Sequence, residues 1–163
     1  AMDEDIAALA ALDDAPKLYK TTKAVTVENI LDEFDLAVEK LMENDVKPET
    51  KIVATVSPWV KTLLRKAYVQ LDTDNSEMIK NGYVGRYNNL YIKVSNNTHK
   101  NADNGSDIMI RTQRAVAFAN PLTHVEPYRP EKRFADAVKG FVLYGTKIVR
   151  PKEMIVLNCK KGA

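Results

Sequence analysis

The stretch RPEKRFADAVKGFVLYGTKIVRPKEMIVLNCKK, residues 129–161, decides how this sequence is interpreted. Residues 134–148 within it are apolar and rich in β-forming side chains, and Gly140 and Gly145 are expected at bends or bulges. Arg150 and Pro151 predict a turn before a final strand over residues 154–157. The stretch therefore predicts two extended segments separated by a short turn.

The residues before this stretch also favour strands. Asn81-Gly82 is a turn signal, and residues 84–87 and 90–95 predict a hairpin around positions 88–89, with Gly82 and Gly85 as structural turn residues. Residues 96–107 have the composition of a loop, which we expect to lie mostly in solvent. Strand-like runs follow at 108–112, 115–119 and 122–126.

Two helices are predicted earlier in the chain. Apolar residues recur every three to four positions over residues 26–44, with Thr26 as the expected N-cap. A β-branched strand at 51–56 leads into a second helix, where Ser57 is placed to cap the helix and Pro58 to occupy its first position. Two helices against a mixed, mostly antiparallel sheet make an α+β fold.

Residues 3–12 predict a further helix, which begins without an entry segment. We therefore expect it to be the end of a longer helix that the sequence cuts. Residues 13–25 are read as a polar connection.

The composition fits one globular domain, or one domain with a fragment of another. The chain has 163 residues and a formal net charge of +2, and no apolar run is long enough to cross a bilayer. Cys159 is the single cysteine, which excludes a disulfide framework and a cysteine metal cluster.

The net charge conceals a strong asymmetry along the chain. Residues 1–50 carry 13 acidic and 5 basic side chains, whereas residues 51–163 carry 9 acidic and 19 basic ones, giving net charges of −8 and +10. Three interpretations are open: solvated faces of one domain, complementary surfaces that meet between copies, or a basic side that faces packaged nucleic acid.

No pattern typical of an enzyme, metal site or cofactor site occurs. His99 and His124 each lack a second histidine or cysteine at ligand spacing, and the common nucleophile and phosphate-loop motifs are absent. The acidic residues Glu131 and Asp136 are interleaved with Arg129 and Arg133, which favours structural or interfacial charge pairs over general acid–base chemistry. We therefore expect no enzyme activity and no cofactor.

In this order the segments resemble the major capsid protein family of tailed phages, the Hong Kong 97 coat fold. The resemblance is carried by residues 53–68 (VATVSPWVKTLLRKAY), by NGYVGR at 81–86 followed by YIKVSNN, and above all by residues 129–140 and 144–151. It covers nearly the whole chain, aligned to the C-terminal half of such a protein.

The resemblance implies a division of the chain. Residues 1–25 would be the end of the family's spine helix and a connection, residues 26–127 the axial domain, and residues 128–163 strands returning to the axial and peripheral domains. The family's N-terminal arm, its extended loop and most of the spine helix would lie before Asp3, so the chain is expected to be a truncated fragment.

The resemblance also implies a function. We expect a structural subunit of a phage or prophage capsid that assembles into pentamers and hexamers around DNA. Its expected partners are copies of itself, packaged DNA bound without sequence preference, and scaffold and portal proteins, but no membrane. It would be made in the host bacterial cytoplasm and reside in the virion. An encapsulin-like compartment shell protein is the alternative within the fold, and a nucleic-acid-binding module is the alternative from another class.

Overall fold

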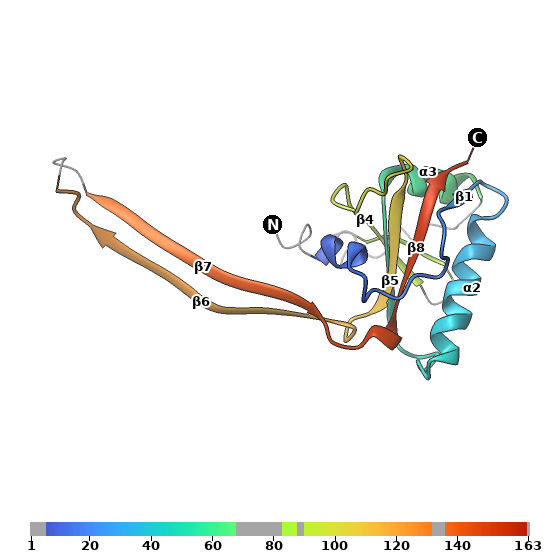
Figure 1. Ribbon diagram of the computed structural model, residues 1–163, viewed down its shortest axis with the longest axis horizontal. Helices are drawn as coiled ribbons and strands as arrows, with labels where there is room; N and C mark the ends of the chain where they lie inside the picture. Colours follow the sequence, from blue (N-terminus) through green and yellow to red (C-terminus); the bar gives the residue numbers. More distant parts are fainter. Residues whose placement is uncertain (1–5, 68–82, 88–89, 132–135, 163) are drawn as a thin grey trace.

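A computed structural model describes residues 6–67, 83–87, 90–131 and 136–162 of the chain. Two parts are visible in Figure 1: a body made of a six-stranded sheet with two helices, and a long two-stranded hairpin that projects from it. The predicted α+β class with two helices and a mixed sheet is confirmed.

The sheet of the body has the strand order β1-β8-β5-β2-β4-β3. These strands are β1 (Lys23–Val25), β2 (Ile52–Val56), β3 (Tyr83–Tyr87), β4 (Leu90–Val94), β5 (Ser106–Thr112) and β8 (Met154–Lys161). The pairs β1–β8 and β2–β4 are parallel, and the other three are antiparallel. The C-terminal strand β8 therefore lies inside the sheet, between a strand from the start of the chain and one from its middle.

Helices α2 (Ile30–Glu43) and α3 (Pro58–Lys66) cover one face of this sheet. Phe34 and Leu41 of α2 and Leu64 of α3 pack against alternate residues of the strands, among them Ile92 and Ile110. Because successive strand residues point to opposite faces, these apolar residues form one continuous core on the helical side.

The N-terminal segment covers part of the opposite face. Residues 6–8 are helical and continue into the 3-10 helix η1 (Leu9–Ala11). Ala10 packs with Met109, Met154 and Val156 in a second, smaller apolar cluster. Within the described residues the predicted helix over 3–12 is therefore short and ends in a 3-10 turn.

Several boundaries differ from those expected. The connection at 13–25 contains β1, because Lys23–Val25 gains backbone partners by pairing with the end of β8. The regular part of helix α2 begins at Ile30 and not directly after Thr26, because residues 27–29 form a turn; across this turn the Ile30 N–H donates to the Thr26 carbonyl at 3.2 Å and the Thr26 N–H to the Asn29 side chain at 2.8 Å. Ser57 lies at the N-cap of α3, but its hydroxyl bonds to Ser106 at 2.6 Å.

The loop between β4 and β5 is anchored to the body, contrary to the expectation of a mostly solvated segment. Thr98 is buried, and the Asn101 amide donates to the Cys159 carbonyl at 2.8 Å. His99 Nδ1 lies 2.8 Å from the buried carboxylate of Asp107. Polar composition here reflects hydrogen bonding to neighbouring strands as well as exposure to water.

Candidate assembly surface

The projecting hairpin consists of β6 (Val116–Tyr128) and β7 (Ala137–Ile148). The strands are antiparallel, with Val116 opposite Ile148 at the base and Tyr128 opposite Ala137 near the tip. The runs predicted at 115–119 and 122–126 are one strand, interrupted by a register shift between Ala119 and Leu122. In Figure 1 the hairpin extends well beyond the body, so most of its length lies away from the other described residues.

One face of this hairpin carries no charge. Even-numbered positions of β7 share a face with the residues that they oppose in β6, since side chains alternate between faces along a strand. We call this the uncharged hairpin face; its members with described side chains are Val116, Phe118, Val125, Pro127, Val138, Val142, Tyr144, Thr146 and Ile148.

Much of the uncharged hairpin face is open to solvent. Val138 is 72% exposed, Val125 65% and Val142 54%, while Phe118 and Tyr144 stack at 6.1 Å between ring centroids. Soluble monomers rarely expose a contiguous apolar patch of this kind, and such patches mark interaction sites. A two-stranded hairpin is also only marginally stable alone in water. This face is therefore the strongest candidate for a protein–protein contact.

The other face of the hairpin is mixed in character. Lys139 lies 2.5 Å from Glu126, and His124 Nε2 lies 3.2 Å from the same carboxylate. Hydrogen bonds from Lys139, and then from His124, hold the pKa of Glu126 below its ordinary value. Tyr128, Phe141 and Leu143 are exposed hydrophobic residues on this side. The two faces thus differ chiefly in charge.

The predicted charge pairs lie at the tip of the hairpin. Arg129 Nε donates to Asp136 Oδ1 at 2.7 Å, and both side chains are about four-fifths exposed. Glu131 lies in the turn and is exposed, whereas Arg133 falls outside the described residues. The structure therefore brings together Arg129 and Asp136. A pair this exposed contributes little to stability.

The predicted turn glycines lie in strands where they are described. Gly85 is at the irregular pairing of β3 with β4, and Gly145 of β7 is opposite Ala119, beside the register shift of the hairpin. At Gly140 a Cβ atom would lie 3.0 Å from the His124 carbonyl oxygen, so the two strands approach closely there. Gly82 lies outside the described residues.

A second candidate surface is the outward side of α2. Asp32, Asp35, Glu39 and Glu43 are exposed there, with Leu36 between them. The outward side of α3 carries Arg65 and Lys66 instead. The charge asymmetry of the sequence is thus displayed on surfaces of opposite sign.

Sequence reasoning missed the uncharged hairpin face, although its signal is present. Val138, Val142 and Ile148 alternate with Lys139 and Lys147, but the face is defined only once β6 is placed opposite β7. Among the described residues no cluster of three potential metal ligands occurs, and no helix is long and apolar enough to span a membrane.

Comparisons with known proteins bear on the fold. No protein-family model and no curated protein matches the sequence. Solved structures do match: a chain from Mycobacterium phage Che8 at a TM-score of 0.72 and 22% identity, and the bacteriophage PhiM1 mature capsid at 0.67 and 20%. The capsid of Cyanophage P-SCSP1u gives 0.67 at 17% identity, and a virus-like particle from Pyrococcus furiosus gives 0.52 at 16%.

These matches cover 96–99% of this chain, which spans only 59–62% of the length of the matched chains. The shared architecture therefore includes both the body and the hairpin. The chain has the Hong Kong 97-type fold of phage capsid subunits.

Proposed function

We propose that this chain is part of a phage or prophage coat subunit that assembles with copies of itself into a capsid. The observation that carries the proposal is the fold, which matches phage capsid chains over nearly the whole sequence. A structural role also accords with the described residues, which present exposed interaction surfaces and no cluster of metal-ligating side chains. On this proposal the chain is not an enzyme.

The uncharged hairpin face supports assembly on physical grounds. Covering side chains such as Val138, Val125 and Val142 would release apolar surface from water, at roughly 25 cal/mol for each Å² buried. Protein from the rest of the subunit or from neighbouring copies would supply that cover. The acidic side of α2 would meet basic surfaces of a neighbour, as ring-closing contacts between unlike surfaces require.

We propose that the body corresponds to the axial domain of the fold and the hairpin to strands of the peripheral domain. The predicted division after residue 127 falls at the last residues of β6, so in this proposal the hairpin spans the whole of 116–148. Residues 6–8 and η1 would follow the spine helix. The matched chains are longer than this one, which supports the expectation of further subunit segments.

In this role the subunit would assemble into pentamers and hexamers that enclose DNA. Scaffold and portal proteins would be its partners in assembly. The subunit would be made in the host bacterial cytoplasm and reside in the virion. An encapsulin-like compartment is the alternative within the fold; the likeness to the phage capsid structures favours the phage coat.

A pair of hairpin variants of the full-length coat gene product tests this role. Val142→Asp puts a charge on the uncharged hairpin face, and Lys147→Asp puts the same side chain on the opposite face. We expect Val142→Asp to reduce the yield of particles at least tenfold, because a buried unpaired carboxylate is costly, while Lys147→Asp still assembles. Sedimentation velocity measures the particle fraction. Normal assembly of Val142→Asp would contradict the proposed role of this face.

A further inference from the structure

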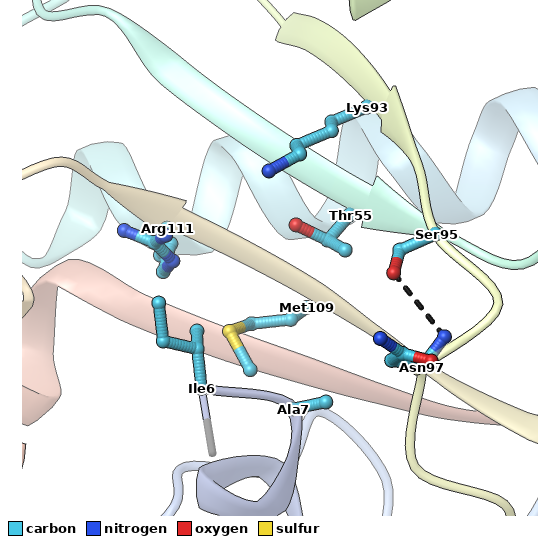
Figure 2. Close-up of a pocket in the computed structure, with 8 residues that line it drawn as sticks. All are labelled: Ile6, Ala7, Thr55, Lys93, Ser95, Asn97, Met109 and Arg111. Atoms are coloured by element: carbon cyan, nitrogen blue, oxygen red, sulfur yellow. Dashed lines mark hydrogen bonds between the residues drawn. The ribbon is translucent and has the colours of Figure 1, made fainter. Parts of the chain in front are cut away.

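A small pocket lies on the face of the body sheet that α2 and α3 leave open. It is formed by residues from β2, β4 and β5, by the loop after β4, and by the N-terminal segment. Figure 2 shows these side chains around one space, with Lys93 and Thr55 on one side and Ile6 and Ala7 on the other. Neither helix of the body contributes to it.

Two cations border this pocket from either side of β2. In the sheet register Thr55 is opposite Lys93 of β4, and Val53 is opposite Arg111 of β5. All four residues are on the face away from the helices, because their strand neighbours Ile52, Ala54 and Ile110 lie in the helix-covered core. Lys93 and Arg111 are therefore on the same face of the sheet, one beside Thr55 and the other beside Val53, two residues apart along β2.

The pocket combines positive charge with neutral hydrogen-bond donors. Thr55, Ser95 and Asn97 line it beside Lys93 and Arg111, the apolar side chains of Ile6, Ala7 and Met109 complete the lining, and none of its described lining residues is acidic. The Ser95 hydroxyl oxygen accepts a hydrogen bond from the Asn97 N–H at 3.2 Å, so its proton can be donated to a ligand. Lys93 and Arg111 also interact with other groups of the chain. An anion is favoured because both positive charges line the same pocket.

The size of the pocket restricts the ligand. Its volume is about 50 Å³. Since one water position needs roughly 10–15 Å³ on this measure, the pocket accommodates about three to five water-sized atoms. A tetrahedral oxyanion has that many heavy atoms and presents oxygens in several directions, which suits donors arranged on different walls.

We propose that this pocket binds a phosphate group, held by Lys93 and Arg111 and by the neutral donors Thr55, Ser95 and Asn97. Charge-assisted hydrogen bonds from lysine and arginine to phosphate are among the strongest in proteins. The site does not depend on the capsid role. The phosphate could belong to free inorganic phosphate or to the backbone of a nucleic acid.

Positive charge continues across the same face toward the sheet edge. Lys51 lies 4.6 Å and Arg86 5.3 Å from the ring centre of Tyr91, which shares this face with Lys93. An aromatic ring flanked by cations suits a nucleic-acid strand whose phosphates follow the cations. Because the positive charge continues beyond the pocket, a phosphate of a nucleic-acid backbone is one of the two phosphate sources that the titrations below distinguish.

An NMR titration of the ¹⁵N-labelled chain with sodium phosphate tests the proposal, with sodium chloride at equal ionic strength as the reference. We expect saturable shifts of the Thr55, Ser95 and Asn97 amides with phosphate and not with chloride. Arg111→Gln and Lys93→Gln should each weaken binding about tenfold or more. Lys152→Gln, at an exposed position outside the pocket, should leave the affinity unchanged.

Thr55→Val tests the same site with little risk to the fold, because valine has a similar shape and favours strands. We expect a loss of several-fold in phosphate affinity while amides elsewhere keep their positions. The proposal would be overturned if wild type gave no saturable shift, or if the pocket variants bound phosphate as tightly as Lys152→Gln.

A second titration identifies the source of the phosphate. A short single-stranded oligonucleotide that shifts the same three amides and competes with inorganic phosphate would assign the pocket to nucleic-acid backbone. An oligonucleotide that leaves these amides unmoved, while phosphate still shifts them, would assign it to free phosphate. Either result keeps the oxyanion site.

Discussion

Cys159 shows how position in the sheet controls the chemistry of a single side chain. It lies on β8 among the core residues beneath the helices and is 1% exposed. Removal from water, followed by the nearby charges of Glu33 and Asp107, raises the pKa of its thiol to about 12. Its nucleophilic thiolate form is therefore scarce at neutral pH.

We expect Cys159 to react with a disulfide reagent at pH 8 on the order of a thousandfold more slowly in the native chain than in urea, given its ordinary pKa near 8.5 when unfolded. The absorbance of the released thiol measures both rates. Rapid labelling of the native protein would show that β8 is not held inside the sheet.

Glu153 links the base of the hairpin to the body. Its carboxylate accepts hydrogen bonds from the buried Thr112 hydroxyl and, at 2.8 Å, from Arg150 Nη1. The bond from Thr112, and next the one from Arg150, hold the pKa of Glu153 below its ordinary value of 4.5. Its ionised form therefore stabilises the fold above that pH, and this contribution is lost as the pH falls through the lowered value.

Glu153→Gln should reduce the free energy of unfolding by about 1 kcal/mol at pH 7, because a charge-assisted hydrogen bond becomes a neutral one. The difference between variant and wild type should shrink below about pH 4 as the wild-type carboxylate becomes protonated. Urea denaturation at pH 7 and pH 3.5 measures it. A difference independent of pH would exclude ionisation as its cause.

Helix α2 illustrates how much of an element the sequence predicts. The spacing of apolar residues identified the helix and its buried side, including Phe34 and Leu41. Its regular part starts at Ile30, three residues later than predicted, because residues 27–29 form a turn in which the Ile30 N–H bonds to the Thr26 carbonyl at 3.2 Å. Periodicity reports packing, whereas the geometry of the first turn decides where the regular helix begins.

Substitutions two positions apart test the packing of this helix. Phe34→Ala should reduce the free energy of unfolding by about 3–5 kcal/mol, since Phe34 is 1% exposed and its loss leaves a cavity. Leu36→Ala, at a position that is 45% exposed, should change it by about 0.5 kcal/mol or less. Urea denaturation compares the two variants. Equal effects would mean that the helix is rotated from the orientation described.

The sequence predicted some of the strands and missed others. Alternating apolar residues predicted β4, and runs of strand-forming residues predicted β5 and the first half of β8, but β1 was missed because its partner lies more than a hundred residues away. The two runs predicted at 115–119 and 122–126 form the single strand β6, in which Pro121 has no backbone N–H to donate. The register shift between Ala119 and Leu122 accommodates that position.

The candidate site could be predicted only in part for the same reason. The stretch 129–161 indicated the fold. Its interleaved acidic and basic residues predicted charge pairs, and Arg129 and Asp136 form one such pair in the structure. The uncharged hairpin face and the pocket bordered by Lys93 and Arg111 each combine residues from different strands. Such surfaces depend on sheet register, which one strand alone does not define.

At the scale of the whole molecule, a folded body carries a hairpin that buries little of its own apolar surface. The body is held by a core that α2 and α3 share with the sheet, whereas much of the uncharged hairpin face is exposed. The outward side of α2 is predominantly acidic, whereas that of α3 is basic. This combination is expected of a subunit that completes its burial on meeting other protein.

Cryo-electron microscopy of the particles formed by the full-length gene product tests the central claim most directly. We predict closed shells in which each subunit contains this body and hairpin, with Val138 and Val142 of the uncharged hairpin face covered by protein. A product that stays monomeric under conditions where related coat proteins assemble, or shells in which that face is open to solvent, would contradict the account.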